Sequence, residues 1–589
     1  MGLTDYVESI LTTIPERKRR PFLYHASLRA EESSITVIEA PTGYGKTVIS
    51  QAMALRSLDD GLKCIVSFPL RTLLEDQLSK FRETFRSLKL NDKLIGARYM
   101  HHPGSRYLSM PITLTTVDTL SLTLFGIAPE DIGKAFGRYD GTSTGSLGHY
   151  LFSRAMVLLS DLVLDEVHLL SDSTKSLNFL VALIRIFAEH GGRITFMSAT
   201  IPNSLKKLLR DECKDIGISI VEFSEDSDED FLNERKRKRY SLSLEKLRPE
   251  DKFDGILEFL REARRDGFRR SIVVFNTVRE AISFYDRVRR DGSLVSEDKL
   301  LLIHSRFTGE DRERIFGRVK ELRGSEEYLI VSTQVIEAGV DVSSDIFVTD
   351  LAPAASLIQR LGRFLRYDEK CGRVMIWYES LDGNRYKGVY DTELVRSTLH
   401  FLEDESDVNF HVPSSYKRLL DHVYPECSFT VNPSEVRDLI NIPMALRDPF
   451  MAIRKFMELE GSFVRESTLV PVVPSSLVRD HLRVEDMLIP MDLSVVCRIR
   501  PDEELVRKGC STKGGKRSSP PERVPPAHSG SGPTLVERVK IEDSFWLPEE
   551  RVKEKVIRHM LSSCFVAFIM KGRYDRDLGM VIEHEGEGP

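Results

Sequence analysis

The sequence predicts an α/β protein with two parallel-sheet units followed by a mainly helical C-terminal region. Short apolar runs rich in β-branched residues alternate with helical stretches in two blocks, 1–222 and 240–388. Beyond residue 389 the pattern turns mainly helical, as in 395–405 and 413–424. The length of 589 residues, at about 150 residues per domain, agrees with about four domains.

Each block supplies five expected strands with expected helices between them. The strand-like runs of the first block begin at Ile35, Lys63, Ile112, Leu162 and Arg193. Those of the second block begin at Ser271, Leu301, Tyr328, Ile346 and Arg373. Runs that are apolar throughout, separated by helices, are typical of a parallel sheet covered on both faces.

The remaining segments are connections and appendages. An acidic cluster followed by a basic one marks 223–239, which we expect to be a solvated charged linker. Residues 389–510 form the helical accessory region, and 511–533 are so dense in Ser, Pro and Gly that they predict an exposed loop or disordered linker. The C-terminal segment, 534–589, contains the apolar run 564–570, which we expect to be a packed strand.

The composition is that of an ordinary globular protein, with 41% hydrophobic and 30% charged residues. The formal net charge is −6, so a nucleic-acid partner would need a local basic groove. The seven cysteines include no C-x-x-C pair, which argues against a zinc ribbon and suits a reducing compartment. No apolar run approaches the roughly 18 residues that a membrane span needs. We therefore expect a cytoplasmic protein with no membrane partner.

A phosphate loop is the first chemical signal. The segment APTGYGKT, 40–47, follows a strand-like run and precedes a helix-like one, as such a loop requires. Backbone N–H groups would hold phosphate oxygens, Lys46 would reach the β- and γ-phosphates, and the Thr47 hydroxyl would bind Mg²⁺. Ala40 stands where the usual motif has glycine, so an ordinary strand-turn-helix junction is the alternative. The predicted ATP-binding residues here are Pro41, Thr42, Gly43, Tyr44, Gly45, Lys46 and Thr47.

Two adjacent carboxylates end a buried strand in the same block. Asp165 is predicted to hold Mg²⁺ together with Thr47, and Glu166 to orient or deprotonate the attacking water. His168 is placed to relay the nucleotide state to neighbouring elements. The alternative reading is a polar cap on the strand.

The second block contains an arginine pair, Arg363 and Arg366, which follows Gln359. A spacing of three puts both guanidinium groups on one helix face. An arginine inserted from one domain into a phosphate site of another stabilises transition-state charge. A basic surface helix is the alternative for this segment alone.

Together these segments resemble a superfamily 2 helicase, in which two RecA-like domains hold ATP between them. Further segments match its motifs Ia, Ib, III, IV and V in the expected order, at 68–73, 115–118, 198–200, 275–277 and 332–341. The resemblance implies that motif V contributes Gly339 and Asp341 to the nucleotide site. The predicted catalytic set is Lys46, Asp165, Glu166, His168, Gln359, Arg363 and Arg366.

Finer details resemble the CRISPR-associated helicase of type I interference. They are the DEVH form at 165–168, the segments 303–307, 337–341 and 359–363, and a weaker echo at 574–579. This resemblance implies recruitment to a guide-RNA interference complex at an R-loop and movement along the displaced single-stranded DNA.

The sequence departs from that family at two places. Where the family commonly has a glutamine that reads adenine, the nearest candidates are Tyr24 and His25. The phosphate loop begins near residue 40, which leaves no room before it for an HD nuclease domain, and the C-terminal histidines are scattered. We therefore expect no nuclease site here, and the split forms of the family imply a separate HD nuclease subunit.

A translocating enzyme must bind its strand through phosphates, because it moves over every sequence. Polar residues at the strand ends suit this task, although loop capping is the alternative for each. The predicted nucleic-acid contacts are Pro69, Arg71, Thr72, Thr116, Asp118, Asn276, Thr277, His304, Ser305, Arg306, Thr333 and Gln334. Two other functions remain open at this point, a DExH RNA helicase and an ATP-gated nucleic-acid clamp that does not unwind.

Overall fold

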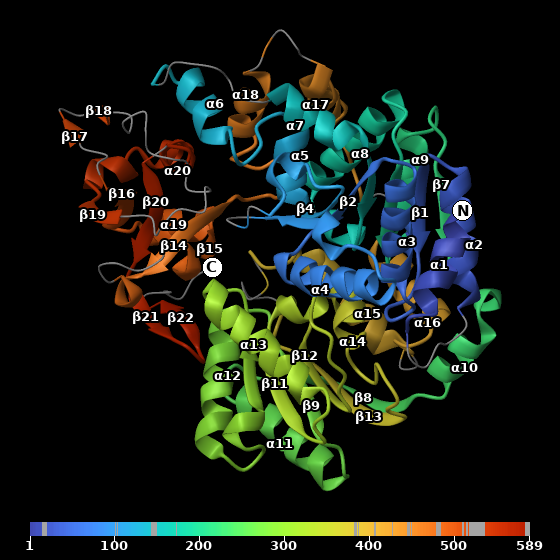
Figure 1. Ribbon diagram of the computed structural model, residues 1–589. Helices are drawn as coiled ribbons and strands as arrows, with labels where there is room; N and C mark the ends of the chain where they lie inside the picture. Colours follow the sequence, from blue (N-terminus) through green and yellow to red (C-terminus); the bar gives the residue numbers. More distant parts are fainter. Residues whose placement is uncertain are drawn as a thin grey trace.

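The structure is a computed structural model. It describes residues 1–582 apart from 15–19, 100–101, 103, 143–149, 172, 382–385, 387, 406–407, 427, 445–447, 449, 479–483, 509–511, 514–515, 518–535 and 563. The loop expected at 511–533 lies largely outside these residues. Figure 1 shows two α/β domains, one above the other, with the strands beyond residue 468 gathered at the left of both.

The first domain is built on a parallel seven-stranded sheet in the order β3-β4-β2-β5-β6-β1-β7. Its strands are β1 (Ile35–Glu39), β2 (Lys63–Phe68), β3 (Ile95–Arg98), β4 (Ile112–Thr116), β5 (Ser160–Leu164), β6 (Ile194–Ser198) and β7 (Ser219–Glu222). Its helices are α1 (Leu3–Leu11), α2 (Pro21–Glu32), α3 (Lys46–Asp59), α4 (Arg71–Ser87), α5 (Val117–Leu124), α6 (Ile132–Tyr139), α7 (Tyr150–Leu158), α8 (Thr174–Glu189) and α9 (Asn203–Glu212). The five predicted strands are present, and β3 and β7 are additional.

The second domain has a parallel six-stranded sheet in the order β10-β11-β9-β12-β13-β8. Its strands are β8 (Arg239–Lys246), β9 (Arg270–Val274), β10 (Leu300–Ile303), β11 (Tyr328–Ser332), β12 (Ile346–Asp350) and β13 (Cys371–Tyr378). Its helices are α11 (Lys252–Arg265), α12 (Val278–Asp291), α13 (Gly309–Leu322) and α14 (Ala354–Leu361). The central strands are buried along their whole length, as their uninterrupted apolar sequence predicts. The prediction of two parallel-sheet domains is confirmed.

The C-terminal region combines helices with a third sheet, so the expectation of a mainly helical 389–510 holds only for its first half. The helices are α15 (Thr392–Asp404), α16 (Pro413–Val423), α17 (Pro433–Met444), α18 (Met451–Glu458), α19 (Leu493–Ile499) and α20 (Val552–Met560). A mixed sheet in the order β15-β14-β20-β16-β19 follows, with β14 (Leu469–Pro474), β15 (Ile489–Asp492), β16 (Glu503–Arg507), β19 (Val536–Lys540) and β20 (Phe565–Met570). Two small hairpins are β17 (Thr512–Lys513) with β18 (Lys516–Arg517), and β21 (Gly572–Asp575) with β22 (Gly579–Ile582). The strand expected at 564–570 is β20.

The C-terminal region is attached to both domains. On the first domain α17 packs against α8, and Ser176 donates a hydrogen bond to the carbonyl of Val464 at 2.8 Å. On the second domain the hairpin β21–β22 lies beside α13 (Figure 1). Its Tyr574 hydroxyl donates to the Asp311 carboxylate at 2.7 Å. The region therefore bridges the two sheets along one side.

The charged segment 223–239 is not the solvated linker expected from its composition. It contains α10 (Glu229–Lys236), in which Phe231, Leu232 and Arg235 are buried. The charge pattern did not indicate that these residues are buried, because an isolated Phe-Leu pair between charges gives no helical apolar stripe. The segment packs against the first domain, so it is part of that domain's structure.

Cys564 is disulfide-bonded, which the sparse cysteines did not predict. Cys64, Cys213, Cys371 and Cys497 are free. Within the described chain no helix has the length and apolar character that crossing a membrane requires.

Candidate active site and nucleic-acid interface

The phosphate loop joins the end of β1 to the start of α3. Gly43 and Gly45 have positive φ angles of 76° and 110°, which only glycine adopts without strain. Lys46 is buried, and its Nζ donates to the carbonyl of Ala40 at 3.1 Å. The loop is therefore curled around a lysine at the N-terminus of a helix, which is a favourable place for phosphate.

The charged segment 223–239 packs against the phosphate loop. The Tyr44 hydroxyl donates to the Asp228 carboxylate at 2.8 Å, and the Tyr44 ring packs edge-on against Phe231. The Arg235 guanidinium donates to the carbonyl of Thr42 at 3.4 Å. Tyr44 is thus an anchor of the loop, and the segment that leads to the second domain contacts the loop directly.

The two adjacent carboxylates lie at the end of β5, next to the loop. The Lys46 ammonium is 3.8 Å from the Glu166 carboxylate. Burial and the neighbouring Glu166 raise the pKa of Asp165. Although burial opposes it, the Lys46 ammonium and the His168 ring lower the pKa of Glu166. Glu166 also has a left-handed backbone conformation, with φ 53° and ψ 46°, a strained geometry for a residue with a side chain.

A chain of polar contacts runs from this carboxylate to the second domain. His168 Nδ1 lies 3.4 Å from the Glu166 carboxylate and 2.9 Å from the Ser198 hydroxyl. The Ser198 hydroxyl accepts a hydrogen bond from the backbone N–H of Thr200 at 3.2 Å. The Gln359 amide then donates to the Thr200 hydroxyl at 3.1 Å. His168 and Gln359 therefore join the two domains through Ser198 and Thr200.

The arginine pair of the second domain reaches the same cleft. Arg363 is buried and donates to the carbonyls of Ile336 and Glu337 at 3.1 and 3.0 Å. Burial and the neighbouring Arg366 lower the pKa of Arg363 to about 9, so it stays cationic at neutral pH. Arg366 lies 3.3 Å from the Asp341 carboxylate.

Two glycines allow the domains to meet closely. A Cβ added to Gly339 would lie 2.6 Å from the backbone nitrogen of Leu73, at the start of α4. A Cβ added to Gly362 would lie 3.0 Å from the Thr42 hydroxyl of the phosphate loop. The second domain therefore touches the loop and α4 through backbone, and the cleft is closed in this structure.

The cleft encloses a cavity of about 720 Å³. Its lining includes most of the predicted ATP-site residues, namely Pro41, Thr42, Gly43, Gly45, Lys46, Thr47, Asp165, Glu166, Gly339, Asp341, Gln359, Arg363 and Arg366. It also includes residues that sequence reasoning missed, among them Thr13, Ile14, Asp76, Gln77 and Lys80. The α4 residues recur at helical spacing after motif Ia, a signal that the sequence did contain.

Tyr24 and His25 are not among the lining residues of this cavity. The Tyr24 hydroxyl donates to the Glu8 carboxylate, and His25 is exposed on α2. Their role in binding the base stays a prediction. Thr13 and Ile14, just beyond α1, are the described residues of the N-terminal segment that reach the cavity.

The predicted metal ligands fit Mg²⁺ by their chemistry. The Thr47 hydroxyl and the Asp165 carboxylate both line the cavity and are hard oxygen donors. Magnesium commonly takes one or two such protein ligands together with substrate phosphates. Over the described ranges no group of three or more His, Cys, Asp and Glu side chains could hold a metal ion.

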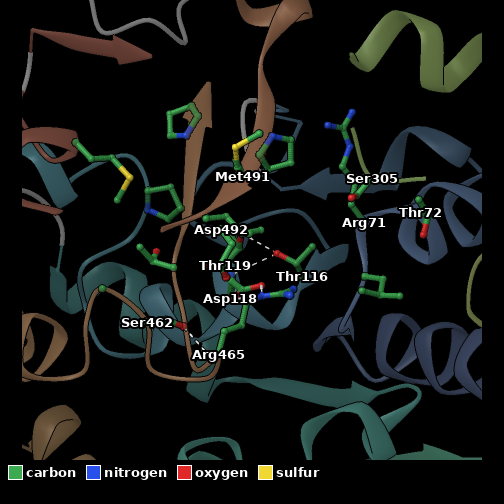
Figure 2. A pocket seen from close by; sticks show the side chains of 18 of the residues that line it. Arg71, Thr72, Thr116, Asp118, Thr119, Ser305, Ser462, Arg465, Met491 and Asp492 are labelled. Atoms are coloured by element: carbon green, nitrogen blue, oxygen red, sulfur yellow. Dashed lines mark hydrogen bonds and ion pairs between the residues drawn. The ribbon is translucent and has the colours of Figure 1, made fainter. Parts of the chain in front are cut away.

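A second cavity, of about 750 Å³, lies where the two domains and the C-terminal region meet. Figure 2 shows Arg71, Thr72 and Ser305 on one side of it and Met491 with Asp492 across from them. Its charged lining is mainly basic, with five arginines, Arg71, Arg98, Arg306, Arg312 and Arg465, against two carboxylates, Asp118 and Asp492. Arg71, Arg98 and Arg465 are each paired with a carboxylate, and Arg306 and Arg312 add further positive charge. We call this cavity the basic groove.

The predicted nucleic-acid contacts divide into two groups. Seven of them line this cavity, namely Arg71, Thr72, Thr116, Asp118, His304, Ser305 and Arg306. Pro69, Asn276, Thr277, Thr333 and Gln334 are not among its lining residues. Asn276 is buried and accepts a hydrogen bond from Arg360 at 2.9 Å, and Thr277 caps α12. For these residues a phosphate contact stays a prediction.

His304 lines the cavity but is fully engaged in structure. One ring nitrogen lies 3.0 Å from the carbonyl of Leu578, in the turn of the C-terminal hairpin. The other accepts from the backbone N–H of Arg306 at 3.1 Å. Burial lowers the pKa of His304 to about 3, so the ring is neutral.

Arg465 is a cavity residue that sequence reasoning missed. Its Nε donates to both Asp118 carboxylate oxygens at 2.8 and 2.9 Å, and its Nη2 donates to the carbonyl of Pro69 at 2.8 Å. Figure 2 shows this ion pair at the cavity wall. Asp118 therefore holds an arginine of the C-terminal region in the groove. Nothing in the sequence around Arg465 marks it, because the pairing joins residues 347 positions apart.

The fold is that of two tandem RecA-like domains with a phosphate-loop cleft between them. A DEAD/DEAH box helicase family model matches residues 25–208, and a model of the C-terminal part of the CRISPR-associated nuclease/helicase Cas3 matches 268–369. The two models together match less than half of the chain, and they assign it by similarity to the Cas3-like CRISPR-associated helicases.

Known proteins agree with this assignment. The CRISPR-associated nuclease/helicase Cas3 of Methanothermobacter thermautotrophicus is 24% identical over 398 residues, which cover 62% of this chain and 43% of the relative. A crystal structure of T. fusca Cas3 with ADP matches with a TM-score of 0.57 and 17% identity, over 79% of this chain and 60% of that one. A chain in a CRISPR RNA-guided surveillance complex, pre-nicking, matches with a TM-score of 0.56 and 15% identity, over 96% and 70%. These structural likenesses concern the fold. The chain spans about half the length of the curated relatives it matches.

Proposed function

We propose that this protein is an ATP-dependent translocase that moves along and unwinds DNA in CRISPR type I interference. The observation that carries the proposal is the single cavity in which Lys46 and Glu166 of one domain meet Arg363 and Arg366 of the other. A phosphate site completed from two domains lets nucleotide turnover drive their relative motion.

In the proposed mechanism the loop N–H groups and Lys46 bind the β- and γ-phosphates of ATP. Glu166, kept ionised by Lys46 and His168, accepts a proton from the attacking water. The water oxygen bonds to the γ-phosphorus, the bond from that phosphorus to the β–γ bridging oxygen breaks, and ADP and phosphate form. Arg363 and Arg366 stabilise the charge on the transferred phosphoryl group. Mg²⁺, held by Thr47 and Asp165, would neutralise phosphate charge.

Loss of the γ-phosphate removes the link between Lys46 and the arginines. The contacts from Glu166 through His168 and Ser198 to Thr200 and Gln359 carry this change to the domain interface. The cleft then opens, and the strand bound in the basic groove advances. The groove spans both domains, so a change in their spacing acts on the strand directly.

The proposal includes three partners that the family resemblance implies. These are the displaced single strand of an R-loop, a guide-RNA interference complex and a separate HD nuclease subunit. The likeness to a chain in a surveillance complex supports the second. The basic groove supports the first.

The deciding experiment measures steady-state ATPase activity without polymer, with single-stranded DNA and with single-stranded RNA. We expect strong stimulation by DNA and little by RNA. Lys46→Ala is the blank and should abolish turnover, because Lys46 is the phosphate-loop cation that binds the β- and γ-phosphates. Preferential stimulation by RNA would move the assignment to an RNA helicase.

A second assay separates a translocase from a clamp. The protein is given a partial DNA duplex with a single-stranded extension, and strand release is followed with ATP and with a non-hydrolysable analogue. Release that requires hydrolysis supports unwinding. DNA-stimulated turnover without any release would instead identify an ATP-gated clamp.

A further inference from the structure

The groove has two chemically different sides. The side formed by the two RecA-like domains supplies four of the five arginines, together with Thr72 and Ser305 and several apolar side chains (Figure 2). The side formed by β14 and β15 of the C-terminal region is mainly apolar, with Leu469, Pro471 and Pro490 among its lining residues and Asp492 as its carboxylate. We call Leu469, Pro471 and Pro490 the apolar wall.

The strand pairing explains how the wall arises. β14 and β15 are antiparallel, with Pro471 opposite Pro490 and Leu469 opposite Asp492. Between them in sequence, Val470 and Val472 are fully buried in the C-terminal core. Side chains alternate across a strand, so Leu469 and Pro471 point the other way, toward the groove. Leu469 is 43% exposed.

The prolines restrict what the wall can bind. A proline has no backbone N–H, so this part of the sheet offers few donors to a polar ligand. A wall of leucine and proline side chains presents flat apolar surface. Such a surface suits the faces of nucleobases rather than their hydrogen-bonding edges.

Arg465 connects the wall to the phosphate side. It lies four residues before Leu469 and is bonded to Asp118 and to the carbonyl of Pro69 in the first domain. The wall is therefore held at a defined place opposite the motif residues. A single strand presents phosphates along one edge and bases along the other, which matches this division of the groove.

We propose that the apolar wall binds the nucleobases of the strand whose phosphates contact the RecA-like domains. The inference rests on the proposed function, since it concerns the same strand. Contact with base faces is independent of sequence, as a translocating enzyme requires. The C-terminal region thus supplies the base-binding half of the groove.

The test compares two labelled oligonucleotides of equal length by fluorescence anisotropy on the full chain. One is oligo-dT, and the other has the same phosphates but abasic sugars. We expect the abasic strand to bind about fivefold to tenfold more weakly, because apolar contact with the bases adds to phosphate binding. Raising the salt concentration should weaken both and leave the ratio of their affinities nearly unchanged, since counterion release depends on phosphates alone.

Variants at Leu469 locate the effect. Leu469→Ser should lower the affinity for oligo-dT and bring the ratio toward one, while Leu469→Phe should keep or raise the ratio. Because the Leu469 side chain is exposed, we expect both variants to fold, and thermal unfolding of each variant verifies this. Leu62→Ser is the matched control, since Leu62 is 47% exposed and lies outside both cavities.

Two results would overturn the inference alone. They are equal binding of the two oligonucleotides by the wild type, and an unchanged ratio in Leu469→Ser. If neither oligonucleotide binds, both the proposed function and this inference are overturned. We expect the ratio of the affinities for oligo-dT and the abasic strand to change when residue 469 is substituted and to stay the same when residue 62 is substituted.

Discussion

The two cavities of this protein are similar in volume, about 720 and 750 Å³, but they are built differently. The phosphate-loop cleft is lined by short motifs, each of which places several functional groups within a few residues. The groove is lined by three regions far apart in the chain, and its apolar wall belongs to no motif. The first cavity depends on local chain geometry, and the second depends on how separate units pack.

The contrast teaches where sequence information resides. A phosphate loop folds around its ligand with its own backbone, so its spacing alone indicates its chemistry. A groove between units has no such local signature. Its residues acquire their roles only after the C-terminal sheet has formed and docked.

Among the substitutions that test this difference between the cavities, Arg363→Ala has the largest expected effect. We expect a loss of turnover of about 10³–10⁵-fold, because Arg363 stabilises the transferred phosphoryl group in the proposed mechanism. The loss of stability should be smaller than in the matched variant, because Arg363 is bonded to two backbone carbonyls and to no carboxylate. Arg360, three residues earlier, is the matched variant, since it is fully buried and bonded to Glu337 and Asn276. Arg360→Ala should destabilise the domain by about 3–5 kcal/mol. Thermal unfolding and ATPase assays on both variants distinguish the roles, and near-normal turnover in Arg363→Ala would refute the assignment.

Glu166→Gln tests the chemical step within the cleft. Removing a general base typically costs about 10²–10⁴-fold in rate. Nucleotide affinity should change little, because Lys46 and the loop remain. Rapid-quench measurement of a single turnover, alongside binding of a fluorescent ATP analogue, checks both. A loss of binding as large as the loss of rate would show that Glu166 acts on the ground state.

The pH dependence of stability tests the groove side. The folded pKa of His304 is about 3, below its usual value of about 6.5 in an unfolded chain. The unfolded state therefore binds the extra proton below pH 6.5, so stability falls as the pH drops from 6.5 toward 3. Between pH 7 and pH 5 this should cost about 2 kcal/mol. Urea unfolding of His304→Gln should show a flatter pH profile, and parallel profiles would argue against a neutral buried ring.

The smallest expected effect belongs to Arg465→Ala. Removing one phosphate-side cation should weaken binding of single-stranded DNA by up to about tenfold and make the salt dependence shallower by about 0.7 in log–log slope. Lys207→Ala is the control, because its exposed ion pair with Glu426 lies far from the groove in sequence and lines neither cavity. Anisotropy titrations at several salt concentrations give both quantities. An unchanged slope would make Arg465 a purely structural tie.

The sequence predicted the two parallel sheets and most of the cleft, because both follow from local patterns. Of the C-terminal sheet it predicted β20 but not β14, which contains prolines and pairs with β20 through Val472 and Phe568. Such a strand lacks a clear propensity, and its partner lies far along the chain. The burial of α10 was also not predicted, because it depends on contacts with distant residues. Phe231 is buried by packing against the rings of Tyr44 and Phe223.

The docking of the hairpin β21–β22 on His304 has a consequence for the order in which the molecule is assembled. The hydrogen bond between His304 and Leu578 joins residues 274 positions apart. During synthesis the second RecA-like domain leaves the ribosome well before this hairpin, and domains fold as units as they emerge. The face of the second domain that lines the groove therefore stays uncovered until Tyr574 and Leu578 have been synthesised. The nascent chain thus passes through a stage in which the ATP cleft can already form but the groove still lacks one of its sides.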